Sequence, residues 1–221
     1  MLKLSDRSPV AKGRNRACYS HPNDPDRMIK VLLPDATPDV VRKNSKSLRR
    51  RWLPAKYLDE QLREIRAFNR LRKRLGEGAW RHIPKFHGTV ETDMGLGIET
   101  DFARSADGSA GVNLTRYFPN EYTESVQRSV QELLRWIKDA PLVPRDFGLH
   151  NVVICENSDA RHHAWLVDGF GSAEFIPLSE WNKSHGQRMA QRRIDRFESH
   201  IQDFLNRAFE EVPRYPLTLD R

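Results

Sequence analysis

The chain has little cysteine and no long apolar run. Cys18 and Cys155 are its only cysteines, and their spacing matches neither a zinc site nor a disulfide framework, which favours a reducing compartment. The N-terminal MLKLSDRSPVAKG lacks the apolar region of a secretion signal, and no segment approaches the length of a membrane span. We therefore expect a cytoplasmic protein, unless a signal of an unrecognised kind exports it.

Apolar residues are also scarce. They make up 38% of the 221 residues, with 5 Trp and 10 Phe, which is low for a globular protein but well above the level of a disordered tail. Because these residues fall in clusters and the length allows a real core, we expect a folded, very soluble protein. It would form either one compact domain of two lobes or two small domains.

Acidic residues are outnumbered by basic ones. Lys and Arg total 37 against 30 Asp and Glu, which leaves a formal net charge of +7. Much of the excess lies in segments 42–52 (RKNSKSLRRRW) and 187–196 (QRMAQRRIDR). Such segments either attract an acidic or phosphate-bearing partner or form a solvated face, and both interpretations stay open here.

The first half of the chain carries mainly strand patterns. Alternation and turn residues predict three short strands, in segments 2–10, 13–20 and 27–33, and the proline-broken segment 34–56 predicts a long connection that includes about one helical turn. A helix with apolar positions at intervals of three or four follows, from Leu58 to Leu75, and ends at the glycines of segment 76–78. Two strands around the turn TDMGLG lie within segment 85–103, and segment 106–111 is a linker.

The second half is mainly helical. Segment 123–138 is a helix with four apolar residues on one face (Val126, Val130, Leu133 and Ile137), stopped by Pro141 and Pro144. Segments 151–155 and 164–168 pair as a hairpin, and segment 179–209 is mainly helical and basic. These patterns predict an α+β fold of two lobes, with a mainly β small lobe over residues 1–104 and a mainly α large lobe over residues 105–221.

Five side chains lie where they could carry chemistry, and each also has an ordinary explanation. Lys30 lies in the apolar strand MIKVLL, where a lysine is most often found at a sheet edge. Glu64 lies on the helix next to its apolar face, where a glutamate usually just borders the core. Asp146 and Asn151 both favour turns, and Asp168 begins an Asp-Gly turn.

Taken together, the five residues form a set that suits phosphoryl transfer from ATP. That reaction depends mainly on positioning and charge neutralisation. One carboxylate accepts the proton of the attacking hydroxyl, while an amide and a second carboxylate hold Mg²⁺ against the phosphates. Since Mg²⁺ prefers oxygen ligands and retains several waters, one Asn and one Asp suffice.

The motifs resemble those of the protein-kinase-like superfamily. MIKV is similar to the kinase strand-lysine motif, PRDFGLHN to the catalytic loop His-Arg-Asp-x-x-x-x-Asn, and LVDGFG to a variant of Asp-Phe-Gly. More narrowly, three segments (LSDRSPVAKGRNRACYSHPNDPDRMIKV, HIPKFHGTVETDMG and FIPLSEW) resemble the YrbL family of PhoP-regulated bacterial proteins. This narrower resemblance covers nearly the whole chain.

The resemblance implies ATP and Mg²⁺ as cofactors and a role for each matching position. Lys30 would contact the α- and β-phosphates and pair with Glu64, although Glu60 lies one turn earlier as an alternative. In the large lobe it implies Asp146 as the catalytic base, Arg145 beside that base, Asn151 and Asp168 as Mg²⁺ ligands, and Val153 as the floor of the adenine pocket. Segment 98–103 (IETDFA) would be the hinge, whose backbone reads the adenine.

The sequence also departs from the kinase pattern. The phosphate-covering segment AKGRNRACY keeps one glycine, Gly13, where kinases usually have three, and Arg14 and Arg16 could compensate by contacting phosphate directly. Pro144 replaces the usual histidine, and Gly169 is inserted after Asp168. Only 53 of the 221 residues follow Asp168, so we expect a minimal kinase-like domain without activation-loop phosphorylation.

Three functional hypotheses follow. The first is an ATP- and Mg²⁺-dependent phosphotransferase acting on a hydroxyl of a protein Ser or Thr or of a small molecule; adenylyl transfer on the same scaffold is a variant of it. The second is a nucleotide-binding pseudokinase that serves as a regulatory module. The third is a nucleic-acid-binding protein that uses the two basic segments. The sequence does not identify the acceptor.

Overall fold

In the part of the chain that the structure describes, the fold consists of two antiparallel sheets, three long helices and several short ones. The computed structural model describes residues 1–52, 54–118, 120–140, 144–169 and 183–210. The first sheet has the order β1-β2-β3-β5-β4, and its strands are β1 (Ala11–Lys12), β2 (Arg16–His21), β3 (Asp24–Leu32), β4 (Phe86–Thr92) and β5 (Gly95–Asp101). The second has the order β6-β7-β8, with β6 (Val112–Asn113), β7 (Val152–Glu156) and β8 (His162–Leu166).

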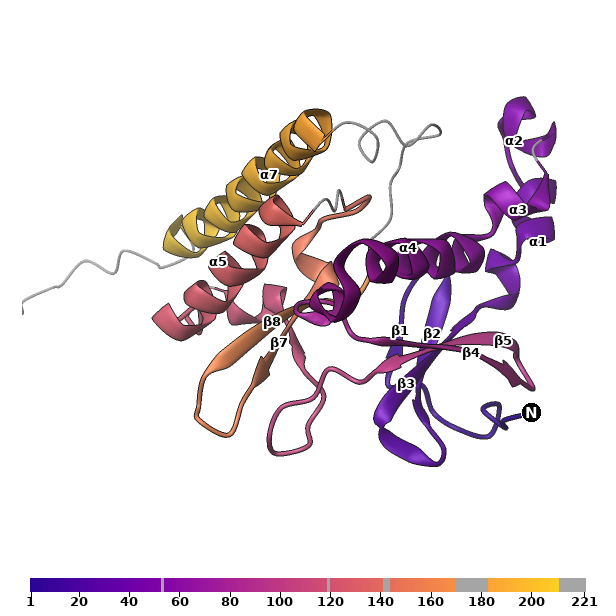
Figure 1. Cartoon of the computed structure of the whole chain (residues 1–221), viewed down its shortest axis with the longest axis horizontal. Helices are drawn as coiled ribbons and strands as arrows, with labels where there is room; N and C mark the ends of the chain where they lie inside the picture. The colour runs from indigo at the N-terminus through magenta and orange to yellow at the C-terminus, as the bar shows by residue number, and fades with distance from the viewer. Residues whose placement is uncertain (53, 119, 141–143, 170–182, 211–221) are drawn as a thin grey trace, which may run out of the picture.

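The helices divide between the two sheets (Figure 1). Helix α4 (Glu60–Leu75) lies against the five-stranded sheet, while α5 (Glu124–Asp139) and α7 (Lys183–Glu210) lie on the side of the three-stranded sheet. The shorter helices are η1 (Pro34–Ala36), α1 (Pro38–Lys43), α2 (Leu48–Trp52), α3 (Ala55–Leu58), η2 (Gly76–Trp80), η3 (Leu114–Tyr117) and η4 (Leu149–Asn151). The expected α+β arrangement, a β-sheet lobe followed by a helical lobe, is confirmed.

The first predicted strand, segment 2–10, is wrong. Within it Leu2 makes only an isolated bridge to Thr92, and the first regular strand begins at Ala11. The cause is Asp93, whose carboxylate accepts the backbone N–H of Leu4 at 2.8 Å and the hydroxyl of Ser5 at 2.6 Å. Because a side chain takes these donors, the segment is tied to the β4–β5 turn without forming a ladder of its own.

The prediction for segment 34–56 is also wrong, because η1, α1, α2 and the first half of α3 occupy it. Pro34 and Pro38 stand in the first turn of η1 and α1. At that position the fixed φ of proline suits a helix and its missing N–H costs no hydrogen bond. The prolines therefore begin helices here, where the sequence pattern indicated that they would break them.

Helix α4 ends at Leu75 as predicted, but it begins at Glu60, two residues after the predicted start, and its buried face is rotated. Asp59 caps its start by accepting the N–H groups of Gln61 and Leu62, and it ends at Gly76, whose φ is 57°. The buried residues are Gln61, Glu64, Ala67, Phe68 and Leu71. Glu64 thus belongs to the buried stripe, and the expectation that it merely flanks the core is wrong.

The second half follows its prediction closely. The helix α5 starts directly after Thr123 and ends before Pro141, and all four predicted apolar residues are buried on it. Strands β7 and β8 pair as a hairpin with Val152 opposite Leu166. Helix α7 covers most of the predicted helical segment, while residues 179–182 lie outside the described part of the chain.

One large core connects the two lobes. Phe68 of α4 stacks on Phe86 of β4 with ring centroids 4.8 Å apart, and Phe147 stacks on Phe197 of α7 at 4.2 Å, all within one continuous cluster. A smaller cluster fills the other face of the five-stranded sheet, and it consists of Leu4, Ala17, Tyr19, Ile29 and Val31.

The division of the chain into lobes between residues 104 and 105 stays a prediction. Among the described residues, no helix has the length and apolar character needed to cross a membrane.

His82 makes the stability of this core depend on pH. Its ring is buried, donates from Nδ1 to the Ala164 carbonyl at 3.0 Å, and stacks on His163. Burial lowers the pKa of His82 to about 4. The unfolded chain binds this proton at a pH of about 6.5, so the contribution of His82 to stability is present above that pH and is lost as the pH falls toward 4.

We expect His82→Asn to flatten this part of the pH dependence. The asparagine Nδ2 can replace the Nδ1–H donor but does not titrate. Urea denaturation between about pH 6.5 and pH 4 should show the free energy of unfolding falling less steeply in the variant than in the wild type. Two parallel curves would contradict the assignment.

Candidate active site

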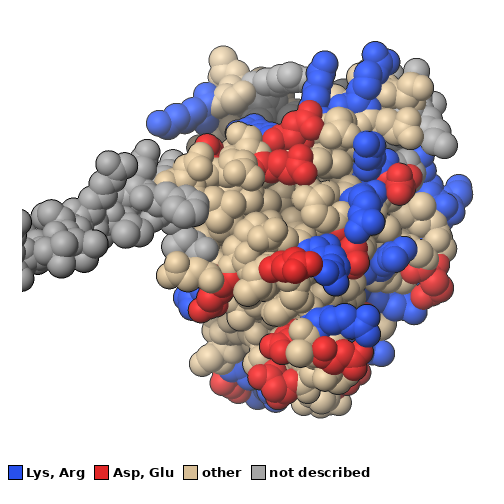
Figure 2. All heavy atoms as spheres, turned by 90° about the vertical axis from the view of Figure 1, so that its left-hand side faces the viewer, with Lys and Arg blue, Asp and Glu red and all other residues tan. Residues whose placement is uncertain are grey.

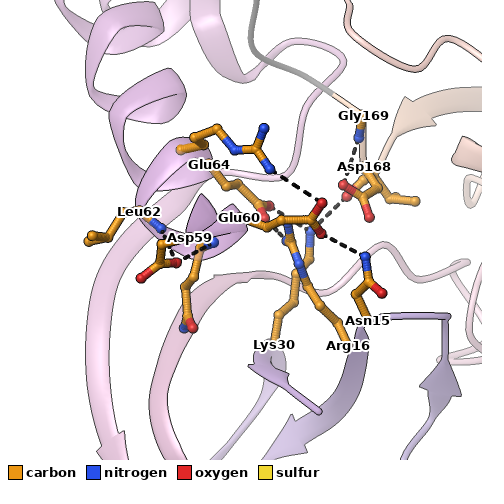
Figure 3. Close-up of polar contacts among 12 residues, drawn as sticks. Asn15, Arg16, Lys30, Asp59, Glu60, Leu62, Glu64, Asp168 and Gly169 are labelled. Atoms are coloured by element: carbon orange, nitrogen blue, oxygen red, sulfur yellow. Dashed lines mark hydrogen bonds and ion pairs between the residues drawn. The ribbon is translucent and has the colours of Figure 1, made fainter. Parts of the chain in front are cut away.

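A buried lysine and glutamate form the centre of the site (Figure 3). Lys30 lies on β3, between β2 and β5, and its side chain is 6% exposed against 3% for Glu64. Its Nζ is 3.2 Å from Oε1 of Glu64 and donates to the Val167 carbonyl at 2.7 Å. The sheet-edge interpretation of this lysine is therefore wrong, and the expected contact with Glu64 is present.

The Val167 carbonyl belongs to the large lobe, so Lys30 contacts both lobes at once. Burial lowers the pKa of Lys30, nearby Asp168 acts in the opposite direction, and Arg16 adds to the lowering. The lysine thus depends on neighbouring carboxylates to keep its charge.

Glu60, the alternative partner for Lys30, has other contacts. It accepts a hydrogen bond from Asn15 at 2.9 Å and one from Arg63 at 3.3 Å, and Nη2 of Arg145 lies 3.8 Å from it. The two carboxylates one helical turn apart therefore have different partners. Glu64 faces the lysine, while Glu60 lies between the β1–β2 turn and the loop that carries Arg145.

Asp168 follows β8 and faces Lys30 from the large lobe (Figure 3). Its Oδ1 accepts the N–H of Gly169 at 2.6 Å. Burial raises the pKa of Asp168. The pKa is nevertheless lowered on balance, because the charges of Lys30 and Arg16, the hydrogen bond from Gly169 and the charge of Arg145 all favour the carboxylate. Asp168 is therefore an ionised carboxylate at neutral pH.

The loop between α5 and β7 is tied to the same turn. The backbone N–H groups of Arg145 and Asp146 both donate to the Gly169 carbonyl, at 2.7 and 3.1 Å. The Asn151 Nδ2 donates to the Asp146 carbonyl at 2.9 Å. The carboxylate of Asp146 is exposed, and its Oδ2 is 3.5 Å from Nε2 of His150. Gly169 thus joins the turn of Asp168 to the loop of Asp146, and Asn151 is bonded directly to that loop.

Gly169 is the residue that the kinase pattern did not predict, and its geometry explains it. Its φ is 79°, and a Cβ built there would lie 2.0 Å from the Asp146 carbonyl oxygen. Only glycine permits this approach of the Asp168 turn to the loop.

The oxygen atoms available here fit Mg²⁺. A carbonyl only accepts hydrogen bonds, so the bond from Asn151 to the Asp146 carbonyl fixes the amide nitrogen there and leaves Oδ1 on the opposite side of the amide. Within the described ranges, no three His, Cys, Asp or Glu side chains gather closely enough to hold a metal by themselves. Asn151 and Asp168 would therefore share a metal with water or phosphate oxygens, as Mg²⁺ prefers.

The turn between β1 and β2 is shorter than a glycine-rich phosphate loop. Gly13 N–H donates to the Arg16 carbonyl at 2.8 Å, which closes the turn over four residues. A Cβ at Gly13 would meet only that carbonyl, at 3.8 Å, so the fold itself does not require glycine here. Arg14 is exposed at the tip, whereas Arg16 points inward.

Some of the groups that were expected to surround the adenine already contact other residues of the protein. Val153 is half-buried, and a Cβ at Gly111 would lie 2.4 Å from one of its methyl groups. In the predicted hinge, the N–H groups of Asp101 and Phe102 donate to the Lys85 and Asp26 carbonyls. Those two donors are already used within the fold. The roles of Val153 and of segment 98–103 stay predictions.

Two contacts around the central pair were not predicted from the sequence. Nη1 of Arg16 forms an ion pair with Oε2 of Glu64, and Asn15 bonds to Glu60. The ion pair of Arg16 could have been anticipated from alternation along β2. Alternation places Arg16 on the same strand face as Cys18, which lies opposite Lys30. The choice of glutamate depends on the rotation of α4, which the sequence pattern did not predict.

The two basic segments lie apart from this site. Segment 42–52 runs through α1 and α2, beyond the first turn of α4, and segment 187–196 lies on α7 (Figure 1). Figure 2 shows the side of the molecule that faces away from segment 42–52, and on that face basic and acidic side chains are interspersed. This mixture is typical of a solvated surface.

The fold and the site define a class of protein. A β-sheet lobe holds a lysine against a helix glutamate, and a helical lobe supplies an Asp-x-x-x-x-Asn loop and an aspartate after a hairpin, which is the arrangement of a protein-kinase-like domain. The model of the family described as PhoP regulatory network protein YrbL matches residues 2–202. The chain belongs to this YrbL family.

The chain is also similar to individual relatives and to solved structures. The YrbL proteins of Escherichia coli (strain K12) and Shigella flexneri are each 29% identical over 203 residues, which cover 89% of this chain and 86% of theirs. The chain is also similar to the Mycobacterium tuberculosis PknI kinase domain (C20A_R136N double mutant), with a TM-score of 0.44, 20% identity and coverage of 73% of this chain and 58% of that one. For the Rio2 kinase-ADP/Mg²⁺-phosphoaspartate complex from Chaetomium thermophilum the TM-score is 0.47 and the identity 15%, with coverage of 95% of this chain and 57% of that one.

We expect Glu64→Gln to destabilise the protein far more than Glu60→Gln. The first substitution leaves the buried Lys30 and the half-buried Arg16 without their carboxylate, which costs on the order of 3–5 kcal/mol. Glu60 is 27% exposed, so its loss should cost about 1 kcal/mol or less. Urea denaturation of the full chain measures both values, and equal losses would contradict the central role of Glu64.

We expect Gly169→Ala to cost more than Gly108→Ala. Both glycines have a similar φ, 79° and 82°, but a Cβ at Gly108 meets nothing within 4 Å. The control therefore measures the backbone strain alone, about 1 kcal/mol. Thermal unfolding should show a larger loss for Gly169→Ala, since its methyl group displaces the loop of Asp146. Similar losses would show that the close approach is not required.

Proposed function

We propose that this protein is an ATP- and Mg²⁺-dependent phosphotransferase that transfers the γ-phosphoryl group to a hydroxyl of a protein Ser or Thr or of a small molecule. The supporting observation is the buried pair of Lys30 and Glu64 beside the ionised Asp168. A buried lysine is costly for the fold. Its position between a helix glutamate and the metal-binding candidate favours a role in binding phosphate.

Each side chain would have a distinct part in the reaction. Lys30, oriented by Glu64, would hold the α- and β-phosphates, and Asn151 and Asp168 would hold Mg²⁺, which neutralises charge on the phosphates. Asp146 is exposed on the loop and would accept the proton of the acceptor hydroxyl. The hydroxyl oxygen bonds to the γ-phosphorus while the bond to the bridging oxygen breaks, and ADP leaves.

A nucleotide-binding pseudokinase is the second candidate, and the short β1–β2 turn favours it. The Gly13 N–H, which a phosphate loop would offer to the nucleotide, already donates to Arg16. A protein of this kind would bind ATP without transferring phosphate.

For segments 42–52 and 187–196 we propose contact with an acidic partner, whereas a nucleic-acid role would give a steep salt dependence of binding.

Three substitutions separate these functions. With labelled ATP, Mg²⁺ and fractions of a cell lysate as acceptors, Asp146→Asn should bind ATP within about 2-fold of the wild type but transfer phosphate on the order of 100-fold more slowly or worse. Asp168→Asn should lose Mg²⁺-dependent binding by about 10-fold or more. Asp159→Asn, in the exposed hairpin turn, is the matched control and should change neither.

The pattern of results decides between the candidates. Binding without transfer in the wild type supports the pseudokinase, and transfer that survives both Asp146→Asn and Asp168→Asn contradicts the phosphotransferase. Mass spectrometry of a labelled product distinguishes a phosphoryl group from a whole nucleotide and so tests adenylyl transfer.

A further inference from the structure

Arg16 shares the carboxylate of Glu64 with Lys30 (Figure 3). The guanidinium pairs through Nη1 with Oε2 of Glu64, while Lys30 contacts Oε1. The Arg16 side chain is 14% exposed, so it lies mostly inside the site. One helix glutamate therefore holds two cations from neighbouring strands, one on each oxygen.

Arg16 also faces the candidate metal ligand. In β2 it lies on the same strand face as Cys18, whose cross-strand partner is Lys30. The charges of Arg16 and Lys30 both act on Asp168 and favour its ionised form. The guanidinium thus lies beside the place that the phosphates would occupy if Lys30 binds them.

The glycine of the β1–β2 turn does not offer its N–H to a phosphate. The Gly13 N–H already donates to the Arg16 carbonyl, at 2.8 Å. The Asn15 side chain ties the same turn to Glu60 on α4. The turn is therefore held against the helix, and it would have to break its own hydrogen bond to present Gly13 to a nucleotide.

We propose that Arg16 binds the phosphate chain of the nucleotide as a second cation beside Lys30, in place of the backbone donors of a glycine-rich loop. This inference rests on the proposed nucleotide-binding function. A guanidinium has five N–H donors in a planar fork, and the ion pair with Glu64 uses Nη1. Its remaining donors match phosphate oxygens, which a guanidinium binds in a bidentate manner.

Glu64 is then the positioning residue for both cations. Lys30 and Arg16 balance the charges of Glu64 and Asp168, so the four side chains are neutral as a set. Without Arg16 the set would carry one net negative charge and would repel phosphate. The arginine therefore contributes charge as well as hydrogen bonds, and the nucleoside part of the ligand should not depend on it.

The test compares the affinities of ATP, ADP and adenosine in the presence of Mg²⁺ by calorimetry. Arg16→Gln should weaken ATP and ADP binding about 10-fold or more and leave adenosine binding within about 2-fold. Arg16→Lys keeps the charge but not the fork, so it should show a smaller loss for ATP. Arg128→Gln, on the exposed side of α5, is the control and should leave all three affinities unchanged.

Each outcome decides the matter. A parallel loss of ATP and adenosine binding, or no loss of either, overturns the phosphate role of Arg16 and leaves the proposed function standing. If the wild type binds none of the three ligands, the proposed function fails and the inference fails with it. Should Arg16→Gln not fold, the ratio of ATP to adenosine affinity in Arg16→Lys decides, because a purely structural arginine would leave this ratio at its wild-type value.

Discussion

The burial of Lys30 is the constraint on which the rest of the structure depends. A lysine inside a sheet loses its hydration, and only nearby carboxylates and carbonyls can offset that cost. Glu64 supplies the carboxylate and the Val167 carbonyl supplies the acceptor, so one ammonium group ties the β-sheet lobe, α4 and the large lobe together. Helix α4 therefore turns Glu64 toward the sheet, and Leu62 and Ile65 of its apolar pattern are only half-buried.

A second constraint comes from the large lobe. The Gly169 carbonyl accepts the backbone N–H groups of both Arg145 and Asp146. Because Gly169 has no side chain, the loop of Asp146 can approach it within van der Waals distance. The turn after Asp168 and the loop of Asp146 are therefore one packed unit.

The sequence pattern predicted some elements well because their own residues decide them. Helix α5 has a regular apolar face and prolines after it, and the β7–β8 hairpin has two apolar strands around a polar turn. The pattern failed for segments 2–10 and 34–56, where distant or positional effects decide. Asp93 takes the donors that a strand at residues 2–10 would have used, and Pro34 and Pro38 act as helix starts. Neither effect is visible in local periodicity.

The sequence by itself determined which residue types the candidate site contains and the order in which they follow one another, because motif spacing is a property of the chain. Only the tertiary structure decided which of them meet. Lys30 could have paired with Glu60 or Glu64, whereas alternation along β2 already places Arg16 on the strand face that lies opposite Lys30. The rotation of α4 settled which glutamate both cations meet, since it placed Glu64 on the buried stripe. That rotation depends on the packing of residues far apart in sequence, such as Phe68 on Phe86, so no local pattern could have predicted it.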